Sequence, residues 1–163
     1  MHKRMADRKT VTLYLYLPQA KKVILSRRGK LEKRAGLLQA TVHGQIEPGE
    51  IAQIAMKREF EEEVKGDYHQ LTNIRDLGEA NVGDTVKEHT SYHAAMLPDE
   101  LLSTLQPTQE VSEFVQVSED DLSKITPLSK VRDQEDYDLA ANWVMYDDEL
   151  ETLKKVFKEF SKL

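Results

Sequence analysis

The chain has 163 residues, of which 39% are hydrophobic and 32% are charged, and its formal net charge is −6. This length suits one domain with a real core, and we expect a single domain over residues 1–163. The negative charge gives no electrostatic case for nucleic acid or a membrane surface as a partner. The sequence contains no cysteine, which excludes disulfides, thiolate metal sites and cysteine nucleophiles.

The sequence contains no apolar run long enough for a membrane span or a secretory signal. Together with the lack of cysteine, this predicts a protein of a reducing compartment, the cytoplasm. The sequence does not decide the oligomeric state, and a homodimer stays open.

Two kinds of hydrophobic pattern divide the chain into strands and helices. The expected elements of the first half are strands at 10–17 and 22–26, an extended segment at 37–42 and a helix over 50–65. Those of the second half are an extended segment at 71–81, a turn at 82–84, strands at 86–97 and 110–117, a loop or short helix at 98–105, and helices at about 134–146 and 147–161. Mixed strands with a helix on each side predict an α/β fold, an α/β/α sandwich.

The helix over 50–65 carries three glutamates on one face. Relative to Glu59, Glu62 lies about 60° to one side and Glu63 about 40° to the other, because a helix turns about 100° per residue. Glu61 lies on the back, roughly 160° away. Like charges at this spacing repel, whereas a hard divalent cation requires oxygen ligands. The pattern therefore predicts a Mg²⁺ or Mn²⁺ site.

A solvated acidic face is the alternative, since this is the usual fate of a charge run. Ala52, Ala55 and Met56 lie on the same arc one or two turns earlier, which indicates that the face is turned inward. The loop at 43–50 contains two glycines and a proline before the helix start. Such a turn lets backbone approach a ligand closely and presents free N–H groups to an anion.

The loop and helix together resemble the signature of the Nudix hydrolases. The matching positions are Gly44, Glu50, Arg58, Glu59, Phe60, Glu62 and Glu63. The closing glycine of the signature departs from the pattern, because Lys65 stands in its place and Gly66 follows. We expect Gly66 to end the helix instead.

The resemblance extends over roughly residues 10–125, and no match is identified for the C-terminal helices at about 134–162. Upstream, Arg27-Arg28 followed by Lys33, Gly36-Leu37 and Gln39 resembles the Nudix subgroup that includes isopentenyl-diphosphate isomerase. Downstream, residues 110–115 followed by the acidic run 119–122 resemble the later strand and helix of that subgroup.

The resemblance implies a Nudix-type α/β/α sandwich with a mixed sheet and a metal-dependent site. Metal ligands would be Glu59, Glu62 and Glu63, with the Gly44 carbonyl as a further ligand, and Glu59 could instead be the general base. Arg58 would orient the cluster from beside it.

A further acid is expected outside the helix. Nudix enzymes often have a glutamate at the place of Glu110, where it supplies a metal contact or the base that activates water. Glu113 is three residues further on, so in a strand it points to the opposite face.

Three functions compete. The first is a Mg²⁺- or Mn²⁺-dependent hydrolase that cleaves the diphosphate linkage of a nucleoside diphosphate joined to a moiety X, a small-molecule substrate. The second is isopentenyl-diphosphate isomerase, which needs a cysteine and a histidine; the chain has no cysteine, and Gln45 stands at the histidine position. The third is a catalytically silent binding or regulatory module. Such a module would be expected to lose metal carboxylates, and all three remain, which favours the hydrolase.

Several residues outside the signature have two interpretations. Arg27 and Arg28 are candidate phosphate ligands, but neighbours in a strand point to opposite faces, so at most one faces the site. Lys30, Lys33 and Arg34 either attract an anionic substrate or belong to a solvated loop.

Histidines and aromatic residues of the second half are interpreted as non-metal positions. His89 and His93 share a strand face without a zinc-ligand pattern, which favours a substrate-lining or solvent-facing role. Trp143 and Tyr146 could stack a base, but their helical spacing with Leu139 favours the core.

Overall fold

The computed structural model describes residues 8–83, 87–132 and 137–163. Parts of three predictions lie outside these ranges: Asp84 of the expected turn, Val86 at the start of a long strand, and residues 134–136 of an expected helix.

The described strands form one mixed sheet in the order β5-β6-β1-β2-β3-β9-β8, with β4 paired to β1 and β7 paired to β2. The strands are β1 (Arg8–Leu17), β2 (Lys22–Arg28), β3 (Leu38–Ala40), β4 (Val42–Gln45), β5 (Thr72–Val82), β6 (Glu88–Met96), β7 (Val111–Ser118), β8 (Thr126–Pro127) and β9 (Val144–Met145). Strand β1 is central: it runs antiparallel to β2 and β4 and parallel to β6.

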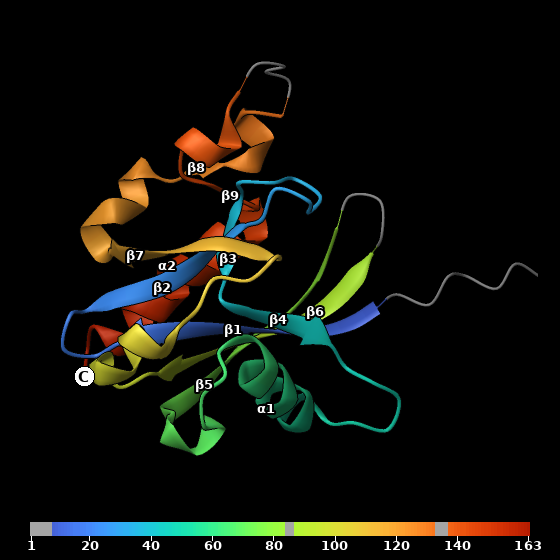
Figure 1. The fold of residues 1–163 in the computed structure, drawn as a ribbon, viewed down its shortest axis with the longest axis vertical. Coiled ribbons are helices and arrows are strands. Elements are labelled where there is room, and N and C mark those ends of the chain that lie inside the picture. Colours follow the sequence, from blue (N-terminus) through green and yellow to red (C-terminus); the bar gives the residue numbers. More distant parts are fainter. Residues whose placement is uncertain (1–7, 84–86, 133–136) are drawn as a thin grey trace, which may run out of the picture.

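Two α-helices lie on opposite sides of this sheet (Figure 1). The helices are α1 (Ala52–Glu63) and α2 (Asp147–Phe160), with short 3₁₀ segments η1 (Tyr68–Gln70), η2 (Asp99–Thr104), η3 (Glu119–Lys124), η4 (Leu128–Lys130) and η5 (Leu139–Ala141). None of the described helices is both long and apolar enough to cross a membrane.

Alternate residues of β1 pack into two different hydrophobic cores. Leu13 and Leu15 are fully buried in the cluster that contains Phe60 of α1. Tyr14 points to the other face and belongs to the cluster that contains Phe157 of α2. Successive strand residues face opposite sides of a sheet, so one buried strand supports both layers. The predicted α/β/α sandwich with a mixed sheet is confirmed.

The helix predicted at about 134–146 is wrong over its described part, 137–146. This segment contains only the short turn η5 and the strand β9, which pairs with β3 through Leu38 and Met145. Val144 is fully buried in a third small cluster with Leu37. Pairing with a distant strand has overridden the helical spacing, which is a common outcome for short segments.

Trp143 and Tyr146 lie at the borders of the cores, although the helical spacing with Leu139 on which this expectation rested is absent from the described segment 137–146. Trp143 is partly buried against the α2-side cluster, and Tyr146 is partly buried against the third cluster.

The C-terminal end of α1 differs from the prediction that Gly66 ends it. The helix stops at Glu63, and Lys65 has a φ of 56°, in the left-handed region that glycine normally occupies. Thus Lys65 takes the conformation of the signature glycine that it replaces. A lysine there carries a steric cost that glycine would not.

Candidate active site

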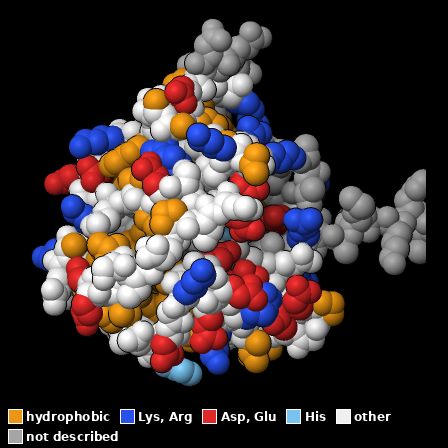
Figure 2. Space-filling model, in the orientation of Figure 1, with side chains coloured by type: hydrophobic (Ala, Val, Ile, Leu, Met, Phe, Trp, Pro, Cys, Tyr) orange, Lys and Arg blue, Asp and Glu red, His pale blue; other side chains and the backbone are white. Residues whose placement is uncertain are grey.

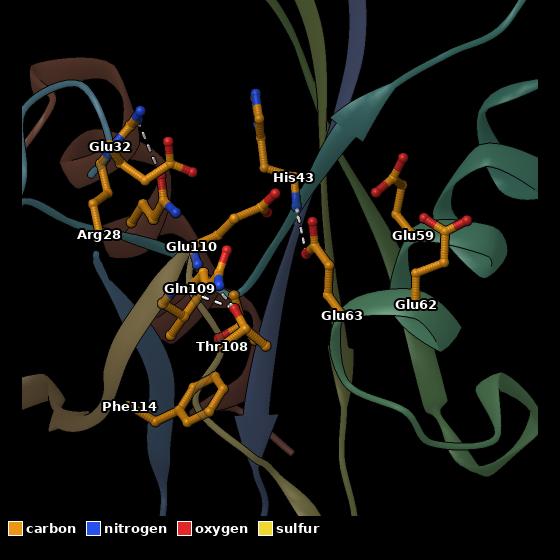
Figure 3. Close-up of a pocket in the computed structure, with 13 residues that line it drawn as sticks. Arg28, Glu32, His43, Glu59, Glu62, Glu63, Thr108, Gln109, Glu110 and Phe114 are labelled. Atoms are coloured by element: carbon orange, nitrogen blue, oxygen red, sulfur yellow. Dashed lines mark hydrogen bonds between the residues drawn. The ribbon is translucent and has the colours of Figure 1, made fainter. Parts of the chain in front are cut away.

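A cavity of about 530 Å³ lies between α1 and the segment that leads into β7. Glu59, Glu62 and Glu63 line it from α1, and Glu110 lines it from the opposite side. Figure 3 shows His43 of β4 between these two walls. Asp and Glu side chains gather over α1 and the adjoining β4 on the face seen in Figure 2.

Arg58 ties the loop before α1 to the acidic face. Its Nη1 donates to Glu59 Oε1 at 2.7 Å, and its Nε and Nη2 donate to the two oxygens of Glu50 at 3.1 and 2.8 Å. A further bond of 3.0 Å joins Nη2 to the carbonyl of Gln45. The fork geometry of a guanidinium suits such paired contacts. Arg58 therefore lies where the sequence analysis expects an orienting residue.

Gly44 lies directly against Glu59. A Cβ atom built on Gly44 would come within 2.1 Å of the Glu59 Cδ and 2.5 Å of its Oε1. Any larger residue would displace this flexible carboxylate, so glycine allows the close approach of β4 to the helix side chain. The backbone of Gly44 is thereby adjacent to the acidic face.

Glu63 lies in the most crowded place of the three. Burial raises its pKa to about 8, and the negative charges of Glu59 and Glu110 also raise it. The N–H of His43 donates to its Oε2 at a long 3.4 Å and opposes this shift. Crowded carboxylates disfavour the charged form unless a cation is close.

The oxygen-rich face fits a hard divalent cation. Its donors are carboxylates, and the Gly44 position leaves room for a carboxylate that a Cβ would exclude. In the described ranges, no three His, Asp or Glu side chains already surround one metal position. Glu59 bonds Arg58, Glu63 accepts from His43, and Glu62 is exposed, so binding would need these side chains to turn inward.

His43 is a site residue that the sequence analysis did not assign. Its Nδ1 lies 3.0 Å from Thr12 Oγ1, and its Nε2 lies 3.4 Å from Glu88 Oε2. Burial lowers the pKa of His43, but the hydrogen bond to Glu88 and the charges of Glu149, Glu88 and Glu63 outweigh it, so the pKa is raised. Its position immediately before the signature glycine was the signal that could have identified it.

Glu110 and Glu113 point in different directions, although Glu110 lies just before β7 (Val111–Ser118) and so outside the strand whose alternation the prediction used. Glu110 lines the cavity and extends toward Glu63 in Figure 3. The Thr108 hydroxyl accepts from the Glu110 N–H at 3.1 Å, and Gly29 N–H donates to the Glu110 carbonyl at 2.9 Å, which holds this segment in place. Glu113 instead pairs with Arg27 at 2.6 Å.

The two neighbouring arginines also separate. Arg27 is 6% exposed. In addition to its pair with Glu113, its Nη1 donates to the carbonyls of Gly36, Leu139 and Asn142 at 2.8 to 3.1 Å. It thus fastens β2 to two distant segments and does not line the cavity, so the structure gives no support to Arg27 as a substrate ligand. Arg28 does line the cavity.

The sequence analysis gave no site role to the other lining residues. They are Glu32, Thr41, Thr108, Gln109, Val111 and Phe114, together with Gln39. Closeness in sequence to Glu110 was the only signal for the four residues between 108 and 114.

The comparisons with known proteins agree with the signature. A model of the NUDIX domain matches residues 6–151, and the chain therefore belongs to the Nudix hydrolase family. This family acts on small-molecule diphosphates and generally requires divalent metal ions. No sequence in a curated set of proteins matches the chain.

Solved structures share the fold at low sequence identity. A C. elegans Ap4A hydrolase in a binary complex is 18% identical, with a TM-score of 0.63, over 94% of this chain and 99% of that chain. A MutT/nudix family protein from Enterococcus faecalis is 18% identical, with a TM-score of 0.64, over 99% of this chain and 65% of that chain. The E. coli dihydroneopterin triphosphate pyrophosphohydrolase is 20% identical, with a TM-score of 0.51, over 69% and 82% of the two chains.

Proposed function

We propose that this Nudix protein is a Mg²⁺- or Mn²⁺-dependent hydrolase that cleaves the diphosphate linkage of a nucleoside diphosphate joined to a moiety X. The observation that carries the proposal is the acidic face of α1 opposite Glu110 across one cavity. Acids packed this closely are unfavourable on their own, and the charges of Glu59 and Glu110 add to burial in raising the pKa of Glu63.

Glu59, Glu62, Glu63 and the Gly44 carbonyl would hold the metal. When bound, a divalent metal neutralises diphosphate charge and lowers the pKa of a water molecule. Arg58 keeps Glu59 in place through the bond of 2.7 Å. Glu110 is separate from the helix carboxylates and accepts the proton of the attacking water.

The test is a phosphate-release screen with Mg²⁺ and with Mn²⁺. Its panel contains nucleotide sugars, dinucleoside polyphosphates, nucleoside triphosphates and coenzyme-type diphosphates. Two similar folds are named for Ap4A hydrolysis and for pyrophosphohydrolysis of dihydroneopterin triphosphate, which supports including polyphosphates.

The double variant Glu62→Gln/Glu63→Gln should lose metal-dependent turnover by at least about a thousandfold, because the amides cannot replace anionic ligands. Glu61→Gln is the matched control: Glu61 is exposed on the same helix and lines no part of the cavity. It should stay within about twofold of wild type. Full activity in the double variant would disprove the proposal.

A further inference from the structure

A second cavity of about 620 Å³ adjoins the candidate active site. Arg28, Gln39 and His43 line both cavities and form their common wall. The second cavity extends from there toward Arg34, in the loop before β3, and Tyr146, at the start of α2. A substrate whose diphosphate occupies the first cavity would therefore place its moiety X toward the second. Both volumes are in the range of small-molecule sites.

The carboxylates of the second cavity already have hydrogen-bond partners within the protein. Glu88 is paired with His43, Asp147 accepts from Ser129, Asp148 accepts from the Tyr92 hydroxyl, and Glu149 accepts from the Ala40 N–H. The acidic groups in this wall are thus engaged by groups of the fold.

Arg28, in contrast, has few acceptors among the residues that the structure describes. Within these residues its buried Nε has no hydrogen-bond partner. Its Nη1 donates to Gln39 Oε1 at 3.4 Å, a long bond. The adjacent Arg27 makes four bonds of 2.6 to 3.1 Å with its guanidinium. The Nε is enclosed by the protein, so a ligand in either cavity would be bound by the Nη atoms at the end of the guanidinium, whose fork geometry suits anionic oxygens.

Further cationic side chains line the outer part of the second cavity. The guanidinium of Arg34 lies over the Tyr146 ring, 6.0 Å from its centroid, a cation–π contact that joins the loop before β3 to the start of α2. Arg8, Lys33 and Arg132 complete this part of the wall. With Arg28, five cationic side chains face four carboxylates in this lining, a small formal excess of positive charge that favours an anion over a cation.

On the basis of the proposed hydrolase activity, we propose that the second cavity binds an additional anionic group of the substrate, a phosphate or carboxylate on the moiety X. Arg28, at the common wall, selects substrates that carry this group. The substrate class is then a nucleoside diphosphate joined to a negatively charged moiety, in preference to a neutral sugar.

A binding experiment without turnover tests the cavity itself. Inorganic phosphate is titrated in EDTA into wild type, Arg28→Gln and Arg75→Gln, and amide shifts are followed by ¹H–¹⁵N NMR. Arg75 is the matched control, because this β5 arginine is in neither lining. We expect saturable shifts around Arg28 and Gln39, weakened at least about tenfold in Arg28→Gln and unchanged within about twofold in Arg75→Gln.

Phosphate shifts that persist in Arg28→Gln, or that spread over exposed lysines alone, would overturn the proposal. Arg34→Gln provides a second variant in case Arg28→Gln does not fold, and it should also weaken phosphate binding.

A kinetic experiment tests selection. UDP-glucose and UDP-glucuronate differ only by a neutral hydroxymethyl and an anionic carboxylate at the same carbon. The wild-type ratio of kcat/KM for glucuronate over glucose should exceed about ten and fall toward one in Arg28→Gln, but not in Arg75→Gln. Equal losses on both substrates would overturn the proposal, since Arg28 would then act only on the hydrolysed diphosphate.

The two proposals fail in different ways. Loss of phosphate binding in Arg28→Gln, with no hydrolysis of any nucleotide by wild type, would contradict the hydrolase and still support the anion site. Hydrolysis with phosphate binding unaffected by Arg28→Gln would support the hydrolase and overturn the anion site.

Discussion

The two helices that flank the sheet each carry a partly buried glutamate with a raised pKa, and the two surroundings differ. In α1, the pKa of Glu63 is raised to about 8, first by burial and next by the charge of Glu59. In α2, burial raises the pKa of Glu149 to about 7, and the next largest influence, a hydrogen bond from Ala40, opposes the shift. Burial alone therefore does not indicate a site, whereas crowding by other acids indicates a place for a cation.

The largest effect on turnover should come from Gly44, because its backbone lies directly against the Glu59 side chain of α1. Gly44→Ala places a methyl group within 2.1 Å of the Glu59 Cδ, which must move. We expect turnover to fall at least about a hundredfold, because the methyl group takes space that the Glu59 carboxylate needs when it turns to a metal, and a misplacement of about 1 Å can cost this much. Steady-state kinetics with Mg²⁺ and calorimetric metal titration would measure the loss.

Gly78→Ala is the control for this substitution. Gly78 has a φ of 104° and no atom within 4 Å of a Cβ, so the change adds backbone strain without a clash. It should cost about 1 kcal/mol of stability and leave turnover within about twofold. Equal activity of Gly44→Ala and wild type would show that Glu59 is free to move without consequence.

The pH dependence of stability should separate the two glutamates. Each has a folded-state pKa above the ordinary 4.5, so its contribution is fully present below pH 4.5 and is lost as pH rises through about 8 for Glu63 and about 7 for Glu149. At about 1.4 kcal/mol per pKa unit, the losses are at most about 5 and 3 kcal/mol.

Urea unfolding of the metal-free protein at pH 5, 7 and 9 would measure these losses. Each of Glu63→Gln and Glu149→Gln should flatten the dependence of stability on pH, up to about pH 8 for Glu63 and up to about pH 7 for Glu149. Saturating Mg²⁺ should remove the Glu63 interval and leave that of Glu149, because only the acids of α1 gain a cation. An Mg²⁺ effect of the same size in Glu63→Gln as in wild type would contradict this assignment.

Glu110 adds to the crowding from the opposite wall of the cavity, and its effect on turnover should be smaller. Glu110→Gln should lower turnover at least about tenfold, the low end of a general-base contribution. Glu113→Gln should stay near wild type in turnover and lose stability instead, because Glu113 pairs with the buried Arg27. Kinetics and urea unfolding of both variants would check the pair. A turnover loss in Glu113→Gln alone would contradict the catalytic role that we give to Glu110.

The smallest effect concerns the end of α1. Lys65→Gly should stabilise the protein by about 1 kcal/mol, because the left-handed backbone with a φ of 56° is strained for lysine. A Cβ on Gly66 would lie 3.4 Å from Phe60, an ordinary contact, so Gly66→Ala should change stability by less than about 0.5 kcal/mol. Thermal unfolding would compare the stability changes of the two variants. A larger change in Gly66→Ala than in Lys65→Gly would indicate that Gly66 ends the helix.

The sequence by itself determined the sandwich, the acidic helix and the family. These follow from local patterns: alternation in β1, the spacing of Glu59, Glu62 and Glu63, and the glycine before them. Strand alternation also showed that only one residue of the pair Arg27-Arg28 could face the site.

Tertiary structure alone decided which residue of that pair faces the site. Arg27 is buried away from the site because Glu113 and the carbonyls of Leu139 and Asn142, all distant in sequence, accept hydrogen bonds from its guanidinium. The segment 137–146 likewise contributes β9, a strand paired with β3, because long-range pairing and burial of Val144 outweigh its helical spacing. Such contacts join residues about a hundred positions apart, so periodicity, which reports only on near neighbours, carries no information about them.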